Sequence, residues 1–288
     1  SNSLLCGRPH WGAGVIKNIM KIKIGNFDFT ECWDGVLYKK LSCFPDITDW
    51  EIQNVLDFIN YETKNGRSCE IEAEYKILAA INSYKETYRA EIRVSPPQKI
   101  TECTACPKYK GCMTDFVCHT APLENAIKIL ECGRLLSPVL ARKMTAKELK
   151  NEKRNAANDP EDYFDYICFS WGNCQAGDRL VMERKLGRFP SEEDLKFPNF
   201  SPGIRFFFLY DKLKKHPGIT YEGVLPFKIK NEVVLSDWVY SIIIPEEYRE
   251  RIKSHVSKEL DKSIFYVKND CKDIWKWSEK VYKVIKRL

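Results

Sequence analysis

No stretch of this sequence is long and apolar enough to cross a bilayer. The longest apolar runs, residues 204–210 and 239–245, have the length of strands, whereas a spanning helix needs roughly 20 residues. Residues 1–23 also lack a basic flank that leads into a continuous apolar stretch, so we expect no secretory signal there. We therefore expect no membrane partner.

The sequence also lacks compositional bias and a strong charge. No segment is rich enough in Ser, Gly, Gln or Pro to predict disorder, and no internal repeat is present. Lys plus Arg outnumber Asp plus Glu by 46 to 40, and the two signs are mixed along the chain. Charge alone therefore does not indicate a nucleic-acid partner. With 44% hydrophobic residues, the chain can bury a sizeable core.

Twelve cysteines do not make this chain a disulfide scaffold. Such scaffolds are short secreted proteins with small cores, and this chain has 288 residues and is rich in Lys and Glu. We expect the thiols to be reduced and the protein to be cytoplasmic.

Residues 1–97 are expected to form a mainly helical module. Thr48 and Glu51 make a capping box, and apolar residues follow at helical spacing until Asn65 and Gly66. A second amphipathic helix is expected over about residues 70–84. A strand at 90–94 and then Pro96-Pro97 mark the boundary of the module.

The remaining residues carry strand patterns with few helices between them, which predicts an α+β fold and not a doubly wound sheet. A final amphipathic helix is indicated because apolar residues recur every three to four positions over 274–288. The expected strands are residues 116–119, 166–170, 204–210, 223–229, 233–235 and 241–244.

Residues 98–118 predict a small metal knuckle. Cys103, Cys106 and Cys112 place three thiols within ten residues of a polar loop, and a CxxC turn directs two sulfurs at one point, as a tetrahedral site needs. Cys118 is the expected fourth ligand. The alternative fourth ligands are Cys132, Cys174, or the pair Cys6 and His10.

Spacing does not choose the metal, because thiolates suit both structural zinc and an iron–sulfur cluster. The run resembles those that hold auxiliary iron–sulfur clusters in some radical enzymes. The other interpretation is that these thiols are small buried apolar residues.

Residues 116–137 predict a strand that ends in His119-Thr120 and is followed by a helix. Thr120 can cap this helix, Pro122 suits its first turn and Gly133 suits its exit. Strand alternation places His119 on the face opposite Cys118. The segment resembles the first motif of the ADP-ribosyltransferase superfamily, which the poly(ADP-ribose) polymerases, RNA 2′-phosphotransferases and DNA-modifying toxin enzymes share.

Two later segments extend the resemblance. Asn231-Glu232, followed by a short strand, a link and a second strand, resembles the closing motif of the polymerase-type domain. Residues 165–171 resemble the family strand whose aromatic residue packs on nicotinamide. This sequence has Cys168 at the aromatic position, so Tyr163, Tyr166 or Trp171 would supply the stacking face from a neighbouring position.

The resemblance implies that residues 116–288 form a split, mixed or antiparallel β core with flanking helices, which binds NAD as substrate. It implies that Glu232 is catalytic, because a carboxylate beside the ribose stabilises an oxocarbenium-like transition state. His119 would position the adenosine-side ribose. The implied NAD-binding residues are His119, Thr120, Tyr166, Cys168, Ser170, Trp171 and Arg179.

Two hypotheses for the function follow. The first is an NAD-consuming ADP-ribosyltransferase or glycohydrolase that modifies an unidentified macromolecule, protein or nucleic acid, in a toxin or phage-defence context. The second is a non-catalytic metal-containing binding module, which would use the knuckle and the basic segment 142–154 to dock nucleic acid or protein; Cys168 favours it. The other interpretation of residues 142–154 is an ordinary solvent-exposed helix, since Glu residues alternate with its lysines.

Overall fold

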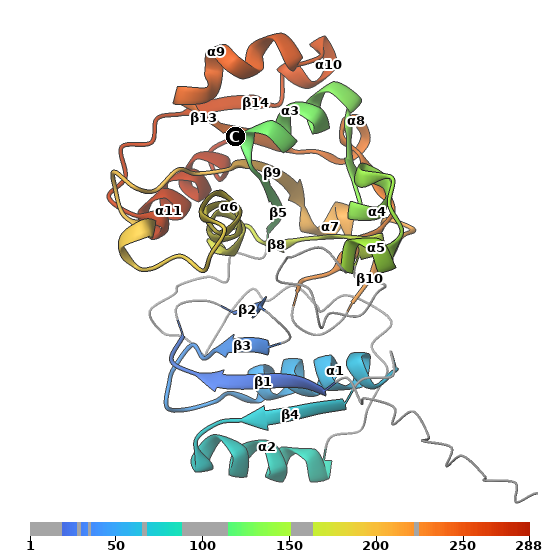
Figure 1. Ribbon diagram of the computed structural model, residues 1–288, viewed down its shortest axis with the longest axis vertical. Helices are drawn as coiled ribbons and strands as arrows, with labels where there is room; N and C mark the ends of the chain where they lie inside the picture. The colour runs from blue at the N-terminus through green and yellow to red at the C-terminus, as the bar shows by residue number, and fades with distance from the viewer. Residues whose placement is uncertain are drawn as a thin grey trace, which may run out of the picture.

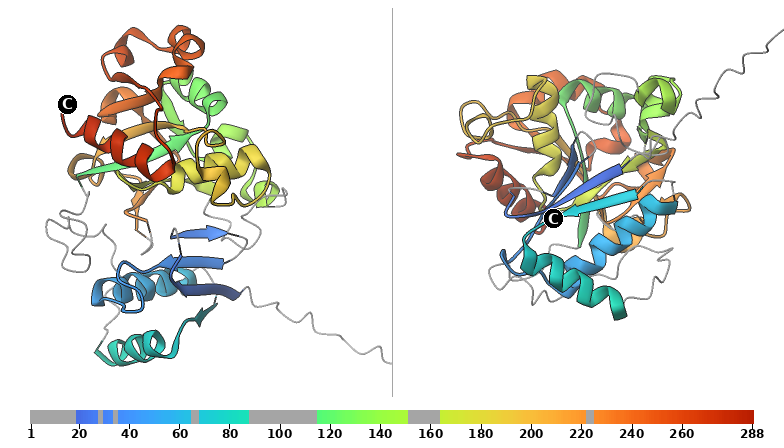
Figure 2. Two further views of the ribbon diagram at one scale, coloured as in Figure 1. Left: turned by 90° about the vertical axis from the view of Figure 1, so that its left-hand side faces the viewer. Right: turned by 60° about the horizontal axis from the view of Figure 1, so that its bottom comes forward.

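The computed structural model describes two units that lie one above the other (Figure 1; Figure 2, left). The first spans residues 19–87 and the second residues 115–288. Within the described part, no helix has the length and apolar character that crossing a membrane requires. The described residues are 19–27, 30–33, 36–64, 68–87, 115–150, 164–221 and 225–288.

The first unit is a four-stranded sheet with two helices. The strand order is β2-β3-β1-β4, with β1 parallel to both of its neighbours and β2 antiparallel to β3. The elements are β1 (Ile19–Gly25), β2 (Glu31–Trp33), β3 (Val36–Lys40), α1 (Asp49–Lys64), β4 (Ser68–Glu72) and α2 (Tyr75–Thr87).

The core of this unit follows from the alternation in β1. Met20, Ile22 and Ile24 are buried on one face of the strand, as a period of two requires. The helices cover that face, and Phe58 of α1 and Ile77 of α2 belong to the same apolar cluster.

The capping box that the sequence predicts at the start of α1 is confirmed. Glu51 accepts hydrogen bonds from the amide and the hydroxyl of Thr48, both at 3.0 Å, and the Thr48 hydroxyl accepts from the amide of Glu51 at 3.3 Å. A second Glu51 oxygen accepts from the amide of Ser42 at 2.7 Å, so this carboxylate also fixes the loop before the helix.

The expectation of a mainly helical first module is wrong. The four-stranded sheet makes it a mixed unit, and the second helix begins at Tyr75 because residues 68–72 pair with β1 as the edge strand β4. The expected strand at 90–94 and the boundary at residue 97 lie outside the described residues.

The second unit is built on a five-stranded sheet of order β14-β13-β9-β5-β8. Its pairs are antiparallel except for β13 with β14. Two smaller sheets, β10-β11-β7 and β12-β6, lie beside it. The strands are β5 (Phe116–Ala121), β6 (Arg134–Leu136), β7 (Tyr166–Cys168), β8 (Ser170–Trp171), β9 (Ile204–Leu209), β10 (Ile219–Thr220), β11 (Lys228–Lys230), β12 (Glu232–Val234), β13 (Ser241–Pro245) and β14 (Ile264–Val267).

Each face of the large sheet packs into its own core. Val117 and Phe206 belong to one apolar cluster, and Cys118 and Phe207 belong to the other. Neighbouring residues of a strand point to opposite faces, so the predicted separation of Cys118 from Val117 is confirmed. The second face lies under α11, whose Trp277 is fully buried there.

Helices connect and flank these strands. The longer ones are α3 (Leu123–Cys132), α6 (Ala176–Leu186) and α11 (Ile274–Ile285). The shorter ones are α4 (Pro138–Arg142), α5 (Ala146–Lys150), α7 (Tyr210–Leu213), α8 (Leu235–Trp238), α9 (Arg249–Ile252) and α10 (Lys258–Asp261). A mixed α+β fold is therefore confirmed, and the helix expected within residues 142–154 is confirmed in part by α5.

The ends of α3 confirm one sequence prediction and correct another. Gly133 adopts the left-handed conformation, φ 67°, at the C-cap, as expected. Thr120 does not cap the helix, because β5 continues through Ala121 and Pro122 takes the N-cap position. The Thr120 side chain instead fits against Gly177 of α6, where an added Cβ would lie 2.3 Å from the Thr120 hydroxyl.

A buried ion pair joins α6, β9 and α11. Asp178 accepts from the Arg205 guanidinium, at 2.9 Å for Nε, and from the amide of Gly203 at 2.8 Å. Arg205 also donates to the Ser278 hydroxyl at 2.8 Å. Both charged side chains are fully buried, so the two helices and the central strand depend on this network for their relative position.

Candidate functional site

His119 lies near the end of β5 and contacts the last residue of β7, a strand of the smaller three-stranded sheet. Its Nδ1 lies 3.0 Å from the carbonyl oxygen of Cys168, and its ring makes an edge contact with Phe169, with centroids 6.2 Å apart. A carbonyl oxygen only accepts, so Nδ1 must carry the proton. Burial lowers the pKa of His119, although the hydrogen bond to Cys168 opposes this effect. The ring is therefore neutral at pH 7, and Nε2 keeps an acceptor lone pair.

Glu232 opens β12 and forms an ion pair with Arg134 of β6. The Arg134 Nη1 to Glu232 Oε2 distance is 2.8 Å, and 41% of the Glu232 side chain is exposed. The two residues lie on paired strands, since Glu232 faces Leu136 and Val234 faces Arg134 in the ladder. Both side chains are exposed, so the ion pair is at the surface and solvent reaches the carboxylate.

Strand β7 and the residue before it connect His119 to Glu232. The carbonyl of Cys168, at one end, holds His119. The carbonyl of Asp165, just before the other end, accepts from the amide of Asn231 at 2.9 Å. Asn231 has a positive φ of 68°, a conformation that Asn tolerates, and it turns the chain from β11 into β12, which begins with Glu232. The two residues are therefore attached to opposite ends of one short segment.

A lysine of β11, the strand that pairs with β7, lies between a tyrosine of β7 and a tyrosine of α1. Lys228 of β11 pairs with Cys168 in the ladder and is fully buried. Its Nζ lies 4.2 Å from the ring centroid of Tyr166 and 4.3 Å from that of Tyr61 in α1, and it donates to the Tyr61 hydroxyl. An ammonium in contact with aromatic faces is stabilised by the ring quadrupoles. This face of β7 is thus covered by the first unit.

A second polar contact between the units lies close by. The Tyr221 hydroxyl donates to the Asn54 side-chain oxygen at 3.1 Å, and this bond is buried. Asn54 and Tyr61 lie about two turns apart on α1, so one helix face makes both contacts.

The other residues expected to bind NAD lie in several environments. The Ser170 hydroxyl donates to the Cys118 carbonyl at 3.3 Å, across the β5-β8 pair. Trp171 packs on Tyr210, with ring centroids 5.0 Å apart. Tyr163 lies outside the described residues.

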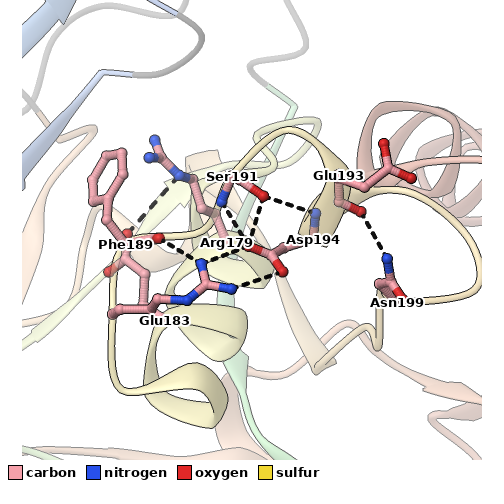
Figure 3. A network of polar contacts seen from close by, with 8 residues as sticks. Arg179, Glu183, Phe189, Ser191, Glu193, Asp194 and Asn199 are labelled. Carbon is pink, nitrogen blue, oxygen red and sulfur yellow. Dashed lines mark hydrogen bonds and ion pairs between the residues drawn. The ribbon is translucent and has the colours of Figure 1, made fainter.

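Arg179 packs at the side of α6 (Figure 3). Its side chain is 6% exposed, its Nε lies 3.9 Å from the Glu183 carboxylate, and its guanidinium lies 3.9 Å from the centroid of the Phe189 ring. The sequence predicts that Arg179 reaches a ribose or a pyrophosphate; in the structure its guanidinium stacks on Phe189.

The loop that carries Phe189 is tied down by a second capping arrangement, which Figure 3 also shows. Asp194 accepts from the amide and hydroxyl of Ser191 at 2.7 and 2.8 Å and from the Arg188 guanidinium at 2.6 and 3.1 Å. The hydrogen bond from Arg188 is the largest of the interactions that lower the pKa of Asp194. The carboxylate thus fixes the loop in which Phe189 stacks on Arg179.

The predicted cysteine knuckle falls mostly outside the described part of the chain, which excludes Cys103, Cys106 and Cys112. Within that part, no group of three or more His, Cys, Asp or Glu side chains could hold a metal ion. Cys118 is 1% exposed in the core under α11, and burial raises the pKa of its thiol to about 11. Metal ligation requires the thiolate, so this environment does not favour Cys118 as the fourth ligand.

Sequence reasoning missed Arg134, Tyr61 and Lys228 as neighbours of the candidate site. Arg134 and Glu232 are 98 residues apart in the chain, and only the register of β6 against β12 brings them together. Tyr61 belongs to the first unit. No local pattern indicates either contact.

Comparison with family models, with curated proteins and with solved structures finds no match to this chain.

Proposed function

We propose that residues 116–288 bind NAD beside β7 and cleave its nicotinamide glycosidic bond, which makes the protein an ADP-ribosyltransferase or NAD glycohydrolase. One observation carries the proposal: the segment of residues 165–168 holds His119 at one end and the turn into Glu232 at the other. The contacts of this segment with both motifs support the proposal, although 113 residues separate His119 from Glu232 in the chain.

His119 would position the ligand through Nε2. With Nδ1 committed to the Cys168 carbonyl and the ring neutral, Nε2 can only accept a hydrogen bond. A ribose hydroxyl is a suitable donor. His119 would therefore orient the ribose without transferring a proton.

Glu232 would stabilise the positive charge that develops on the ribose as nicotinamide leaves. Glycosyl transfer passes through an oxocarbenium-like transition state, and a fixed carboxylate aimed at that charge lowers its energy. The ion pair with Arg134 would orient the Glu232 carboxylate before the ligand binds.

The second candidate function, nucleotide binding without turnover, is favoured by the contacts of Lys228. The family position for the aromatic residue holds Cys168, and the residue opposite it in the ladder is a buried lysine whose ammonium contacts Tyr166 and Tyr61. A fixed positive charge beside this position would repel the cationic nicotinamide ring of NAD. This arrangement suits a domain that binds the adenosine half and leaves the glycosidic bond intact.

Nicotinamide release from NAD distinguishes the two candidates. We expect release by the wild-type protein and at least a tenfold slower rate for Glu232→Gln, because the variant removes the charge that opposes the oxocarbenium ion. Glu279→Gln is the matched control, since Glu279 is also 41% exposed and ion-paired, but lies on α11. Equal rates for wild type and Glu232→Gln would remove Glu232 from the mechanism.

NAD binding measured by calorimetry tests the positioning role separately. His119→Phe keeps an aromatic ring but removes both nitrogens, so affinity should fall whether or not turnover occurs. If NAD binds without nicotinamide release, the second candidate function is correct. If NAD does not bind at all, both are wrong. Transfer of labelled ADP-ribose to protein or to nucleic acid would identify the acceptor class.

The metal knuckle is part of the same proposal. Cys103, Cys106 and Cys112 would hold zinc or an iron–sulfur cluster, which metal analysis of anaerobically purified protein distinguishes. Cys106→Ser should lower the metal content relative to Cys271→Ser, which alters a partly exposed free thiol that is not a candidate ligand. Equal metal content in both variants would contradict the ligand assignment.

A further inference from the structure

A cavity of about 580 Å³ opens at the end of β5 remote from His119. It lies between the first residues of β5, the turn from β9 into α7, the residue before β13, and the last turn of α11. Its lining is formed by Asp115, Phe116, Leu209, Asp211, Lys212, Lys215, Tyr240, Ile285 and Lys286.

One part of this cavity is apolar and aromatic. The rings of Phe116 and Tyr240 meet at a centroid distance of 5.1 Å and an angle of 45°. Leu209 is 38% exposed. A half-buried tyrosine beside an exposed leucine gives a flat ligand, such as a nucleobase, a surface on which to stack.

The other part of the cavity is charged, with three lysines and two aspartates in its lining. Lys286 pairs with Asp115 at 2.9 Å, and Lys212 donates to the carbonyl of Asp237. Lys215 is exposed, and its ammonium makes no ion pair or hydrogen bond within the described part of the chain. It is the cation most available to an incoming anion.

The cavity is separate from the site beside β7. Phe116 opens β5, and His119 follows three residues later, roughly 10 Å along a strand. Their side chains also lie on opposite faces of the large sheet: Phe116 belongs to the cluster under α11, and His119 packs on Phe169 of the other cluster. A ligand in this cavity would therefore not occupy the proposed NAD site.

We propose that this cavity binds a nucleoside monophosphate unit, with the base on Tyr240 and Leu209 and the phosphate at Lys215. The volume suits a ligand of this size, since small-molecule sites span about 300–1,000 Å³. Asp115 and Asp211 offer acceptors for ribose hydroxyls and base amino groups. The unit is either a free nucleotide or one nucleotide of a single strand. The inference does not depend on NAD cleavage.

The test is a titration of the full-length protein, followed by calorimetry, with 5′-AMP and with a 5′-phosphorylated single-stranded pentanucleotide. Adenosine and inorganic phosphate are titrated in parallel, because the proposal requires both halves of the ligand. Four variants are compared: Tyr240→Ala, Lys215→Glu, His119→Phe at the site beside β7, and Lys258→Glu, which makes the same charge change as Lys215→Glu on α10 away from the cavity. Thermal unfolding checks that Tyr240→Ala is folded.

We expect 5′-AMP or the pentanucleotide to bind more tightly than adenosine or phosphate. Tighter binding of 5′-AMP would indicate a free nucleotide, and tighter binding of the pentanucleotide would indicate one nucleotide of a single strand. Tyr240→Ala and Lys215→Glu should each weaken binding about tenfold, because a stacked base and a phosphate contact each contribute on that scale. Lys258→Glu should bind as wild type does, and His119→Phe should retain the binding that Tyr240→Ala and Lys215→Glu weaken.

Three results would overturn the proposal. The first is that neither 5′-AMP nor the pentanucleotide binds at millimolar concentration. The second is that Lys215→Glu and Lys258→Glu lose equal affinity. The third is that Tyr240→Ala binds as tightly as the wild-type protein. A fourth result, complete loss of 5′-AMP binding in His119→Phe, would assign the nucleotide to the site beside β7 instead. Failure of NAD cleavage in wild type would leave the result unaffected, so the two proposals fail independently.

Discussion

Removing one partner of the buried pair Asp178 and Arg205 should strongly destabilise the second unit. In Asp178→Leu the Arg205 guanidinium keeps the Ser278 hydroxyl but loses its counter-charge, which costs about 3–5 kcal/mol. The amide of Gly203 also loses its acceptor, which costs about 1 kcal/mol more. Since domains are stable by only about 5–15 kcal/mol, a large share of the folding free energy is at risk.

Calorimetric unfolding measures this loss with an internal control. For a unit of this size, 1 kcal/mol shifts the melting temperature by about 2–4 °C, so the transition of the second unit should fall by roughly 10–20 °C. The transition of the first unit should move much less, because its core forms a separate cluster. Asp178→Asn should lose less than Asp178→Leu, since the amide oxygen can still accept from Gly203.

The double variant Asp178→Leu/Arg205→Met decides whether charge burial is the cause. Replacing both charged groups by apolar side chains removes the uncompensated cation, and such replacements are often neutral or stabilising. We expect the double variant to melt well above Asp178→Leu alone. If it melts at the same temperature or lower, the loss reflects packing of α6 on β9, and the electrostatic reasoning is refuted.

Two further predictions concern Cys118 and the contact between the units. Burial raises the pKa of Cys118 from its usual value near 9 to about 11. The buried thiol therefore contributes its full stability below pH 9, and this contribution is lost as the pH rises toward 11. Between pH 9 and pH 11 the urea midpoint of Cys118→Ala should decline less steeply than that of the wild-type protein. Tyr61→Phe removes only the hydroxyl that accepts from Lys228, whereas Tyr61→Leu also removes the aromatic face, worth about 0.5–2 kcal/mol. The melting temperature should thus fall further for Tyr61→Leu, and equal values would exclude the cation–π contact.

The sequence predicts elements whose causes are local. The capping box of Thr48 and Glu51 starts α1, and Gly133 ends α3 in the left-handed conformation, because both depend on residues within one turn. Alternation along β5 separates the face of Val117 from that of Cys118 for the same reason. These predictions need no knowledge of distant partners.

Predictions that depend on distant partners do not follow from the sequence. Residues 70–74 continue an apolar helical period, yet residues 68–72 pair with β1, whose alternation of Met20, Ile22 and Ile24 provides the sheet edge that they join. Thr120 has the chemistry of a helix cap, but Gly177 approaches so closely that its side chain packs there instead. In both cases tertiary packing outweighs a local preference.

The position of α1 links the first unit to any activity beside β7. Tyr61 reaches Lys228, which lies opposite Cys168 in the ladder, and Cys168 in turn holds His119. A shift of α1 would therefore move the Lys228 ammonium, which lies between Tyr61 and Tyr166. It would also move the positive charge beside Cys168, the position at which the family has an aromatic residue. If NAD binds beside β7, the position of the first unit would determine whether the cationic nicotinamide ring fits beside Lys228. NAD binding and the docking of the two units would then be coupled through Lys228.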